Sequence, residues 1–271
     1  GNGPYIAVVP VCGRRPSTVD PSSCAISADY PFFAREELRR NCPGQPAVLH
    51  FTMPCAGQPI QPVWGGQLFD GAEAIGRRLG RSIMAGFQSA AWEVIDREVP
   101  LVAADAQVEQ TFRKLPDASS ARDALIQSRA AYERLAGLNA ASVARWDAQC
   151  GLARAEGLYN LVEQEGQSAF NALHFMYAAT EIKVMRIDRH VLVGWPGSLS
   201  PHYVDLLKKQ IPEPVFVAGH VNGHTQGDIL DPAAEARGEF GAMPSPLSAT
   251  GAERMVESTV ALINDTRESG A

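Results

Sequence analysis

Two histidines four residues apart, His220 and His224, follow an apolar run in the segment VFVAGHVNGHTQGD, residues 215–228. Neutral imidazole is the commonest zinc ligand in proteins, and it is also the usual general base near neutral pH. In an extended segment, their even spacing would place both rings on one side of the strand. Gly219 and Gly223 favour a turn instead, in which both histidines would bond loop backbone. The residue types therefore predict either a strand end that delivers ligands or an ordinary polar turn.

Polar residues follow three other apolar runs as well, in the segments Cys12–Arg15, Cys55–Gln58 and Gly194–Ser198. Ligands gather at the carboxyl ends of strands in α/β sheets, so these loops would face one cleft if their strands are neighbours. Cys12, Cys55 and Ser198 are candidate nucleophiles within these loops. None of them lies in the GxSxG context of a nucleophile elbow, and a structural role is the alternative for each.

The elements that would position these loops alternate between strands and helices. Strands are predicted over residues 5–11, 47–53, 180–187, 190–194 and 214–221, and helices over residues 29–41, 71–93, 201–211 and 248–267. Residues 105–167 are rich in Ala, Arg, Glu and Gln, and they predict an inserted helical hairpin that serves packing or dimerisation. We therefore expect an α/β fold, a layered mixed sheet flanked by helices, in one domain over residues 1–271.

The composition argues against several classes of partner. The 271 residues carry a net charge of −6, whereas nucleic-acid-binding proteins usually show a basic excess. No apolar run approaches the roughly 18 residues needed to span a bilayer. The first residues lack a signal-peptide pattern, so we expect a cytoplasmic protein, or a secreted one if a signal peptide was removed upstream. The number of cysteines, five, is odd, which argues against a complete disulfide framework, and no CxxC pair is present.

Four segments occur in an order that resembles the catalytic domain of the neutral ceramidase family and its bacterial relatives. They are ISADYP (26–31), CAGQPIQP (55–62), EIKVMRIDRHVLVGWPGS (181–198) and VFVAGHVNGH (215–224). The corresponding family segments look like iSaDyPg, GaaGDxxP, exxxlriGdxxlvgxPGE and vxgyaNxY. The resemblance covers most of the chain except the helical hairpin. It implies a ceramidase-like α/β domain that lacks its N-terminal part.

The family holds a zinc ion that activates water for amide hydrolysis, and most of its ligands are substituted here. The glutamate of PGE falls on Ser198, and the tyrosine after the motif asparagine falls on His224. One family histidine falls on Gly13 or Arg14, and the other would lie upstream of Gly1. The resemblance thus implies zinc as a candidate cofactor in an altered site, with His224 as its candidate ligand.

The first function that these residues predict is a hydrolase, or a related acyl-transfer enzyme, acting on an amide or similar bond. His220 and His224 would act as general base or ligand, Asn222 would orient them, and Gln58 would donate a hydrogen bond to a developing oxyanion. The predicted substrate-binding residues are Arg14 and Arg15, which would hold an anionic group, together with Ser198 and Asp29.

Two alternatives stay open. The chain could be a non-catalytic subunit, or pseudoenzyme, whose fold is completed by a second chain or by an upstream segment. It could also be an interaction protein that assembles into an oligomer through its helical hairpin.

Overall fold

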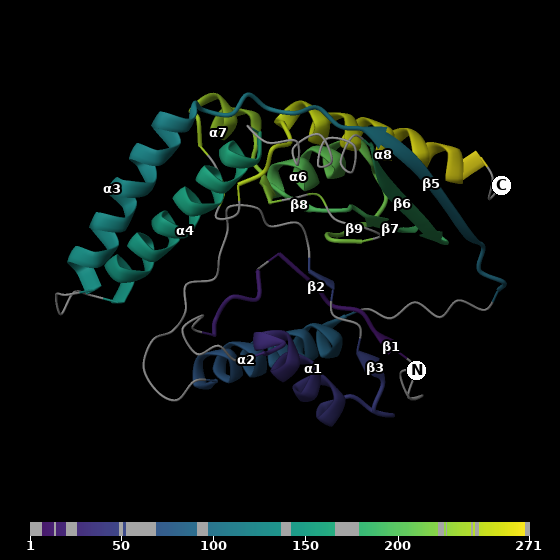
Figure 1. The fold of residues 1–271 in the computed structure, drawn as a ribbon. Helices are drawn as coiled ribbons and strands as arrows, with labels where there is room; N and C mark the ends of the chain where they lie inside the picture. The colour runs from purple at the N-terminus through teal and green to yellow at the C-terminus, as the bar shows by residue number, and fades with distance from the viewer. Residues whose placement is uncertain are drawn as a thin grey trace. The chain divides into compact units, whose positions relative to one another are not determined.

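The structure is a computed structural model, shown in Figure 1. It describes residues 7–13, 15–19, 26–48, 51–52, 69–90, 97–136, 142–165, 179–221, 225, 227–239, 241 and 244–268. The chain divides into two compact units. Unit 1 contains Gly1–Met53 and Gln58–Val99, and unit 2 contains Pro54–Gly57 and Pro100–Ala271. The single domain expected for residues 1–271 stays a prediction, because two compact units can belong to one domain.

Unit 1 is built on two packed helices, α1 (Asp29–Asn41) and α2 (Asp70–Ser89). They approach closely because α2 presents Gly76 to α1, and a Cβ atom at Gly76 would lie only 2.4 Å from the Tyr30 carbonyl oxygen. The helix predicted over residues 29–41 is confirmed at both ends. Its first turn carries Pro31, which suits that position because the missing N–H has no partner there anyway.

The strands of unit 1 form two short parallel pairs. β1 (Ala7–Val8) pairs with β3 (Ala47–Val48), and β2 (Val11–Cys12) pairs with β4 (Phe51–Thr52). The run expected as one strand over residues 5–11 is therefore interrupted, and Pro10 lies at the break, where it has no N–H to donate to a ladder. Val8 and Val48 pack with Leu38 and Cys42 to form the core of this unit.

Unit 2 contains a four-stranded mixed sheet in the order β5-β6-β7-β9. Its strands are β5 (Leu101–Glu109), β6 (Ala179–Ile187), β7 (His190–Gly194) and β9 (Val215–Ala218). β5, β6 and β7 run antiparallel in turn, whereas β7 and β9 are parallel. α6 (Pro201–Gln210) follows β7, and the Ser200 side chain caps it by accepting a hydrogen bond from the His202 N–H. The layered mixed sheet flanked by helices is thus confirmed.

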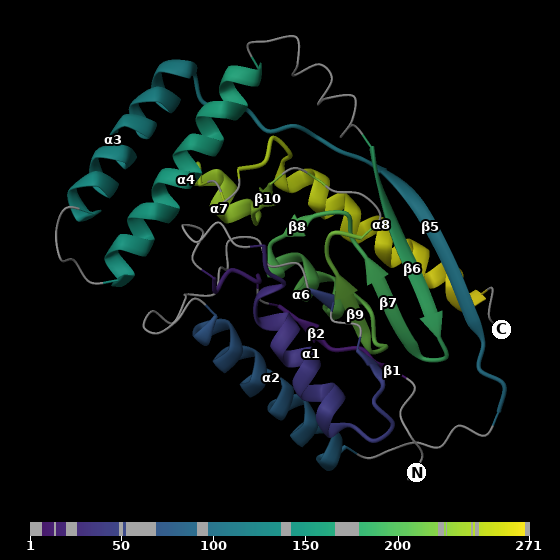
Figure 2. The same cartoon turned by 60° about the horizontal axis from the view of Figure 1, so that its bottom comes forward.

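One face of this sheet is covered by the last helix, α8 (Ala249–Glu268), which packs against β5, β6 and α6 (Figure 2). Alternate residues of β6 and β7 face the helix and are almost fully buried: Ile182, Val184, Val191 and Val193. A further short parallel pair is formed by β8 (Ser198–Leu199), which follows β7 in the chain, and β10 (Asp228–Ile229), which follows β9. The short helix α7 (Pro232–Ala236) comes directly after β10.

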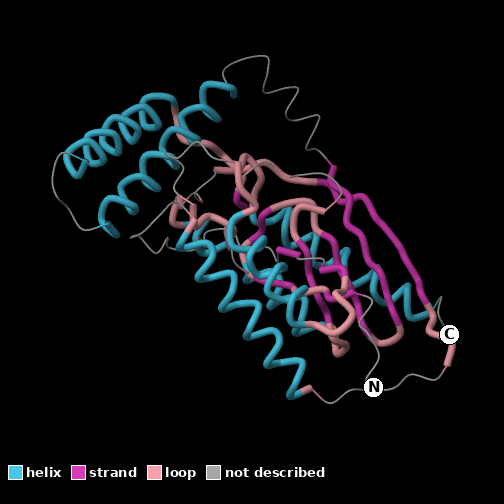
Figure 3. The backbone as a smooth tube through the Cα atoms, turned by 90° about the horizontal axis from the view of Figure 1, so that it is seen from below, coloured by secondary structure: helices cyan, strands magenta, loops and turns pink. Residues whose placement is uncertain are grey.

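The predicted helical hairpin is present between β5 and β6. α3 (Ala118–Ala136) and α4 (Ser142–Glu165) pack side by side (Figures 1 and 3) around Leu115, Ala121, Leu161 and Val162. It begins at Ala118 rather than at residue 105, because residues 101–109 form β5. That strand has few β-branched residues and is stabilised by its nine-residue ladder with β6, so packing overrides local propensity. The role of the hairpin in assembly stays a prediction.

None of the helices in the described part of the chain is long and apolar enough to cross a membrane.

Candidate functional site

The carboxyl ends of β7 and β9 lie beside each other in unit 2, with Gly194 opposite Ala218 as the last pair of the parallel ladder. This confirms that the loops after residues 194 and 218 are neighbours. Four main-chain hydrogen bonds among the described residues join them: Trp195 N to Ala218 O at 2.9 Å, Val221 N to Trp195 O at 2.9 Å, His220 N to Gly197 O at 3.4 Å and Thr225 N to Pro196 O at 2.6 Å. Backbone groups therefore contribute directly to the positions of these loops.

The two predicted site residues in these loops differ in accessibility. His220 is exposed and occupies the left-handed region at φ 57°, which non-glycine residues seldom adopt outside turns and strained sites. Ser198 is only 2% exposed and lies in β8, opposite Asp228 of β10. His220 is thus reached by solvent, whereas the Ser198 side chain is enclosed by protein. Among the described residues, the segment after β9 therefore presents His220, and the choice between a ligand-delivering strand end and a polar turn stays open.

A buried polar layer beneath these loops was not found by sequence reasoning. Thr225 is 2% exposed and Asp228 is 1% exposed. Gly197 and Gly241 make room for them, because a Cβ atom would lie 1.7 Å from Thr225 Oγ1 in the first case and 2.5 Å from Asp228 Oδ2 in the second. The signal in the sequence was the continuation of the histidine segment into TQGD, which places a hydroxyl and a carboxylate directly after the turn.

Two buried aromatic residues fix the surroundings of these loops: Trp195 joins the loop after β7 to α8, and Tyr203 joins α6 to the residue that follows β10. The indole Nε1–H of Trp195 donates to Thr259 Oγ1 at 3.0 Å, and Trp195 is fully buried. The hydroxyl of Tyr203 donates to the Leu230 carbonyl oxygen at 2.8 Å, and burial raises the pKa of this phenol above its ordinary value. Both contacts hold the surroundings of the turn rigid, which is what a preorganised site requires.

Asp29, in unit 1, organises the chain that precedes α1. Its carboxylate accepts hydrogen bonds from Thr18 N at 2.7 Å, Thr18 Oγ1 at 2.5 Å, Val19 N at 2.9 Å and Tyr30 N at 2.6 Å. Asp29 is itself buried and has a φ of 56°. These bonds give Asp29 a structural role, and the substrate-binding role predicted for it stays a prediction. Arg15, in the same segment, is half-buried.

The remaining predicted site residues, Arg14, Gln58, Asn222 and His224, lie outside the described residues. Their convergence with Ser198 on one pocket therefore stays a prediction.

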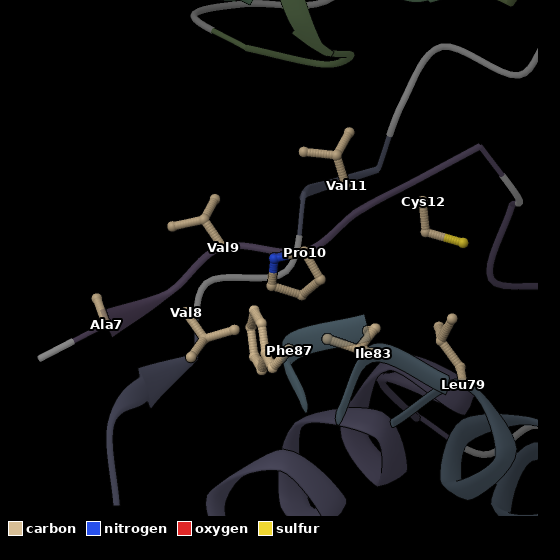
Figure 4. A pocket seen from close by; sticks show the side chains of 9 residues that line it. All are labelled: Ala7, Val8, Val9, Pro10, Val11, Cys12, Leu79, Ile83 and Phe87. Atoms are coloured by element: carbon tan, nitrogen blue, oxygen red, sulfur yellow. The ribbon is translucent and has the colours of Figure 1, made fainter. Parts of the chain in front are cut away.

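Unit 1 contains a cavity of about 320 Å³ between its first strands and α2 (Figure 4). Residues 7–12 line one side, and Leu79, Ile83 and Phe87 line the other from successive turns of α2. The lining is apolar except for the thiol of Cys12, which accepts a hydrogen bond from the Tyr30 hydroxyl at 3.6 Å. A cavity with this lining fits an apolar group, and it offers no base, charge or metal ligand set for catalysis.

The described residues do not fit a zinc site. No group of three or more His, Cys, Asp or Glu side chains among them could hold a metal ion. Ser198, which the sequence resemblance aligns with a zinc-binding glutamate, offers a buried neutral hydroxyl, and a hydroxyl is a poor ligand for zinc compared with a carboxylate.

The chain is similar to known proteins in its fold, whereas the sequence comparisons found no match. No protein-family model matches the chain, and no curated protein sequence matches it. A solved structure described as a ceramidase complexed with C2 aligns with a TM-score of 0.66 at 12% identity, over 97% of this chain and 46% of that one. The neutral ceramidase from Pseudomonas aeruginosa aligns with a TM-score of 0.60 at 15% identity, over 99% of this chain and 45% of that one.

The fold is ceramidase-like. The chain spans less than half the length of either ceramidase, and the sequence identities show the fold alone.

Proposed function

We propose that this ceramidase-like chain is a hydrolase or acyl-transfer enzyme that acts on an amide or related bond at the loops after β7 and β9. One observation carries the proposal: the two parallel strand ends are joined by main-chain hydrogen bonds and present an exposed histidine there. Carboxyl ends of neighbouring parallel strands are where α/β proteins place their ligands.

His220 is the proposed general base. A neutral imidazole takes a proton from water as the water oxygen attacks the carbonyl carbon. It returns that proton to the departing amine when the carbon–nitrogen bond breaks, so the imidazole is regenerated. The residues proposed to assist lie outside the described ones, and they are His224 as a second base or ligand, Asn222 to orient the histidines, Gln58 as an oxyanion donor, and Arg14 beside Arg15 to hold an anionic group.

Zinc enters this proposal only through residues outside the described ones, with His224 as the proposed ligand. A bound zinc ion would supply activation of water. Elemental analysis of the purified wild type and of His224→Ala tests whether His224 is a zinc ligand. Equal zinc content in the two proteins would show that it is not.

Turnover of a panel of N-acyl amides by single variants of the full chain tests the function. His220→Ala should lower kcat by about a hundredfold or more, the usual contribution of a general base. His190→Ala is the matched control, since this histidine begins β7 and stacks on Phe216 at a ring distance of 6.4 Å. Unchanged turnover in both His220→Ala and His224→Ala would eliminate the proposed site.

A second candidate is a non-catalytic subunit whose fold is completed by a partner chain or an upstream segment. The enclosed Ser198 hydroxyl, at the position of the family's glutamate ligand, favours this alternative. Co-purification from the native source should then recover a second polypeptide. A 271-residue monomer that turns over amides by itself would reject it.

A further inference from the structure

Thr225 is anchored by its backbone, while its side-chain hydroxyl has no hydrogen-bond partner among the described residues. Its N–H donates to the Pro196 carbonyl oxygen at 2.6 Å. Its Oγ1 atom is buried and makes no hydrogen bond within the described part of the protein. Most buried hydroxyls in native proteins are hydrogen-bonded, so an exception calls for a physical reason.

The hydroxyl lies against the turn that joins β7 to β8. A Cβ atom on Gly197 would be 1.7 Å from Thr225 Oγ1 and 2.9 Å from Thr225 Cβ, so the threonine side chain fills the space that a side chain at position 197 would occupy. Ser198 follows this glycine directly and pairs with Asp228. Thr225 therefore places an unused O–H donor at the junction of the two strand-end loops.

The same turn also bonds the backbone of His220. The bond from His220 N to Gly197 O is 3.4 Å long, whereas N–H···O bonds usually measure about 2.9–3.0 Å. Catalytic hydrogen bonds are often long in the free enzyme and tighten when substrate binds. A free donor beside Gly197 is suited to hold the turn once it has tightened.

We propose that Thr225 is a positioning residue, whose hydroxyl hydrogen-bonds the turn at residues 196–198 in the substrate-bound state and so fixes the backbone of His220. This inference rests on the proposed hydrolase function. Valine has nearly the shape of threonine without its polar oxygen. Thr225→Val should therefore keep the free protein folded and remove only the donor.

Thermal melting and steady-state turnover of the full-length chain test the proposal together. Thr225→Val should melt at the wild-type temperature or above it, and its kcat should fall about tenfold or more while KM changes little, because misplacement of a catalytic group lowers the rate of the chemical step. Thr225→Ser, which keeps the hydroxyl, should retain most of the turnover. Thr266→Val is the matched control, since that buried hydroxyl donates to the Ile263 carbonyl oxygen at 2.7 Å and its loss should lower the melting temperature.

Three results, each obtained with an active wild type, would overturn the inference alone. A lowered melting temperature in Thr225→Val would show that the hydroxyl already stabilises the free protein. Wild-type turnover in that variant would show that catalysis does not use the hydroxyl, and a Thr225→Ser variant as slow as Thr225→Val would point to side-chain shape instead. A wild type that hydrolyses no amide would refute the proposed function and this inference together, whereas an active wild type with an equally active Thr225→Val would refute the inference alone.

Discussion

Replacing Gly76 with alanine should force α1 and α2 apart. The added Cβ atom would lie 2.4 Å from the Tyr30 carbonyl oxygen, 2.6 Å from Phe33 Cβ and 3.0 Å from the Ala34 nitrogen. A carbon–oxygen contact normally needs about 3.3 Å, so the helices must separate by about 1 Å. Two of the three atoms belong to the backbone of α1 and cannot rotate away. Overpacking of this kind costs about 1–3 kcal/mol.

The matched control is Gly86→Ala in the same helix, where a Cβ atom would meet nothing within 4 Å. Both substitutions gain about 1 kcal/mol from the higher helix propensity of alanine, so their difference isolates the clash. Urea unfolding followed by circular dichroism should place Gly86→Ala above the wild type in stability and Gly76→Ala about 2 kcal/mol below Gly86→Ala. Equal unfolding midpoints for the two variants would refute the claim that close backbone contact joins these helices.

Two further predictions concern the carboxylates of Glu213 and Asp29. Hydrogen bonds from Arg267 lower the pKa of Glu213 from its ordinary 4.5 to about 2, so the stability from this pair should be complete above about pH 4.5 and be lost as the pH falls toward 2. Between about pH 6 and pH 3, the difference in melting temperature between the wild type and Glu213→Gln should become smaller as the pH falls. A difference in melting temperature that does not change with pH would contradict this explanation. Asp29→Asn should lower the unfolding free energy by about 2 kcal/mol, because its charged oxygens accept bonds from Thr18, Val19 and Tyr30, and should leave KM unchanged. A raised KM with unaltered stability would instead favour the substrate-binding role.

Much of the fold of unit 2 was readable from local patterns. The strand over residues 190–194 is confirmed as β7, and the helix predicted over residues 201–211 is present as α6. β5 was missed because its sequence, LVAADAQVE, has little β propensity and is a strand only through its pairing with β6. Tertiary pairing of that kind leaves no local signature.

The candidate site was predictable in part. The sequence placed four loops at one cleft on the condition that their strands are neighbours, and the parallel pairing of β7 with β9 meets that condition for the loops after residues 194 and 218. It did not indicate that Thr225 and Asp228 would be buried. Their burial depends on Gly197 and Gly241, and on which segments approach each other in space. The placing of Arg14, Gln58 and His224 at the same site stays a prediction.

The main-chain hydrogen bonds between the loops after β7 and β9 bear on how such a protein evolves. A bond from Trp195 N to Ala218 O survives nearly any exchange of side chain, since every residue except proline carries the same donor and acceptor. Mutations can therefore accumulate in these two loops and change their chemistry while β7 and β9 keep their arrangement. Such drift would produce the pattern found here. The fold is shared with solved structures at 12–15% sequence identity, while no family model matches the sequence.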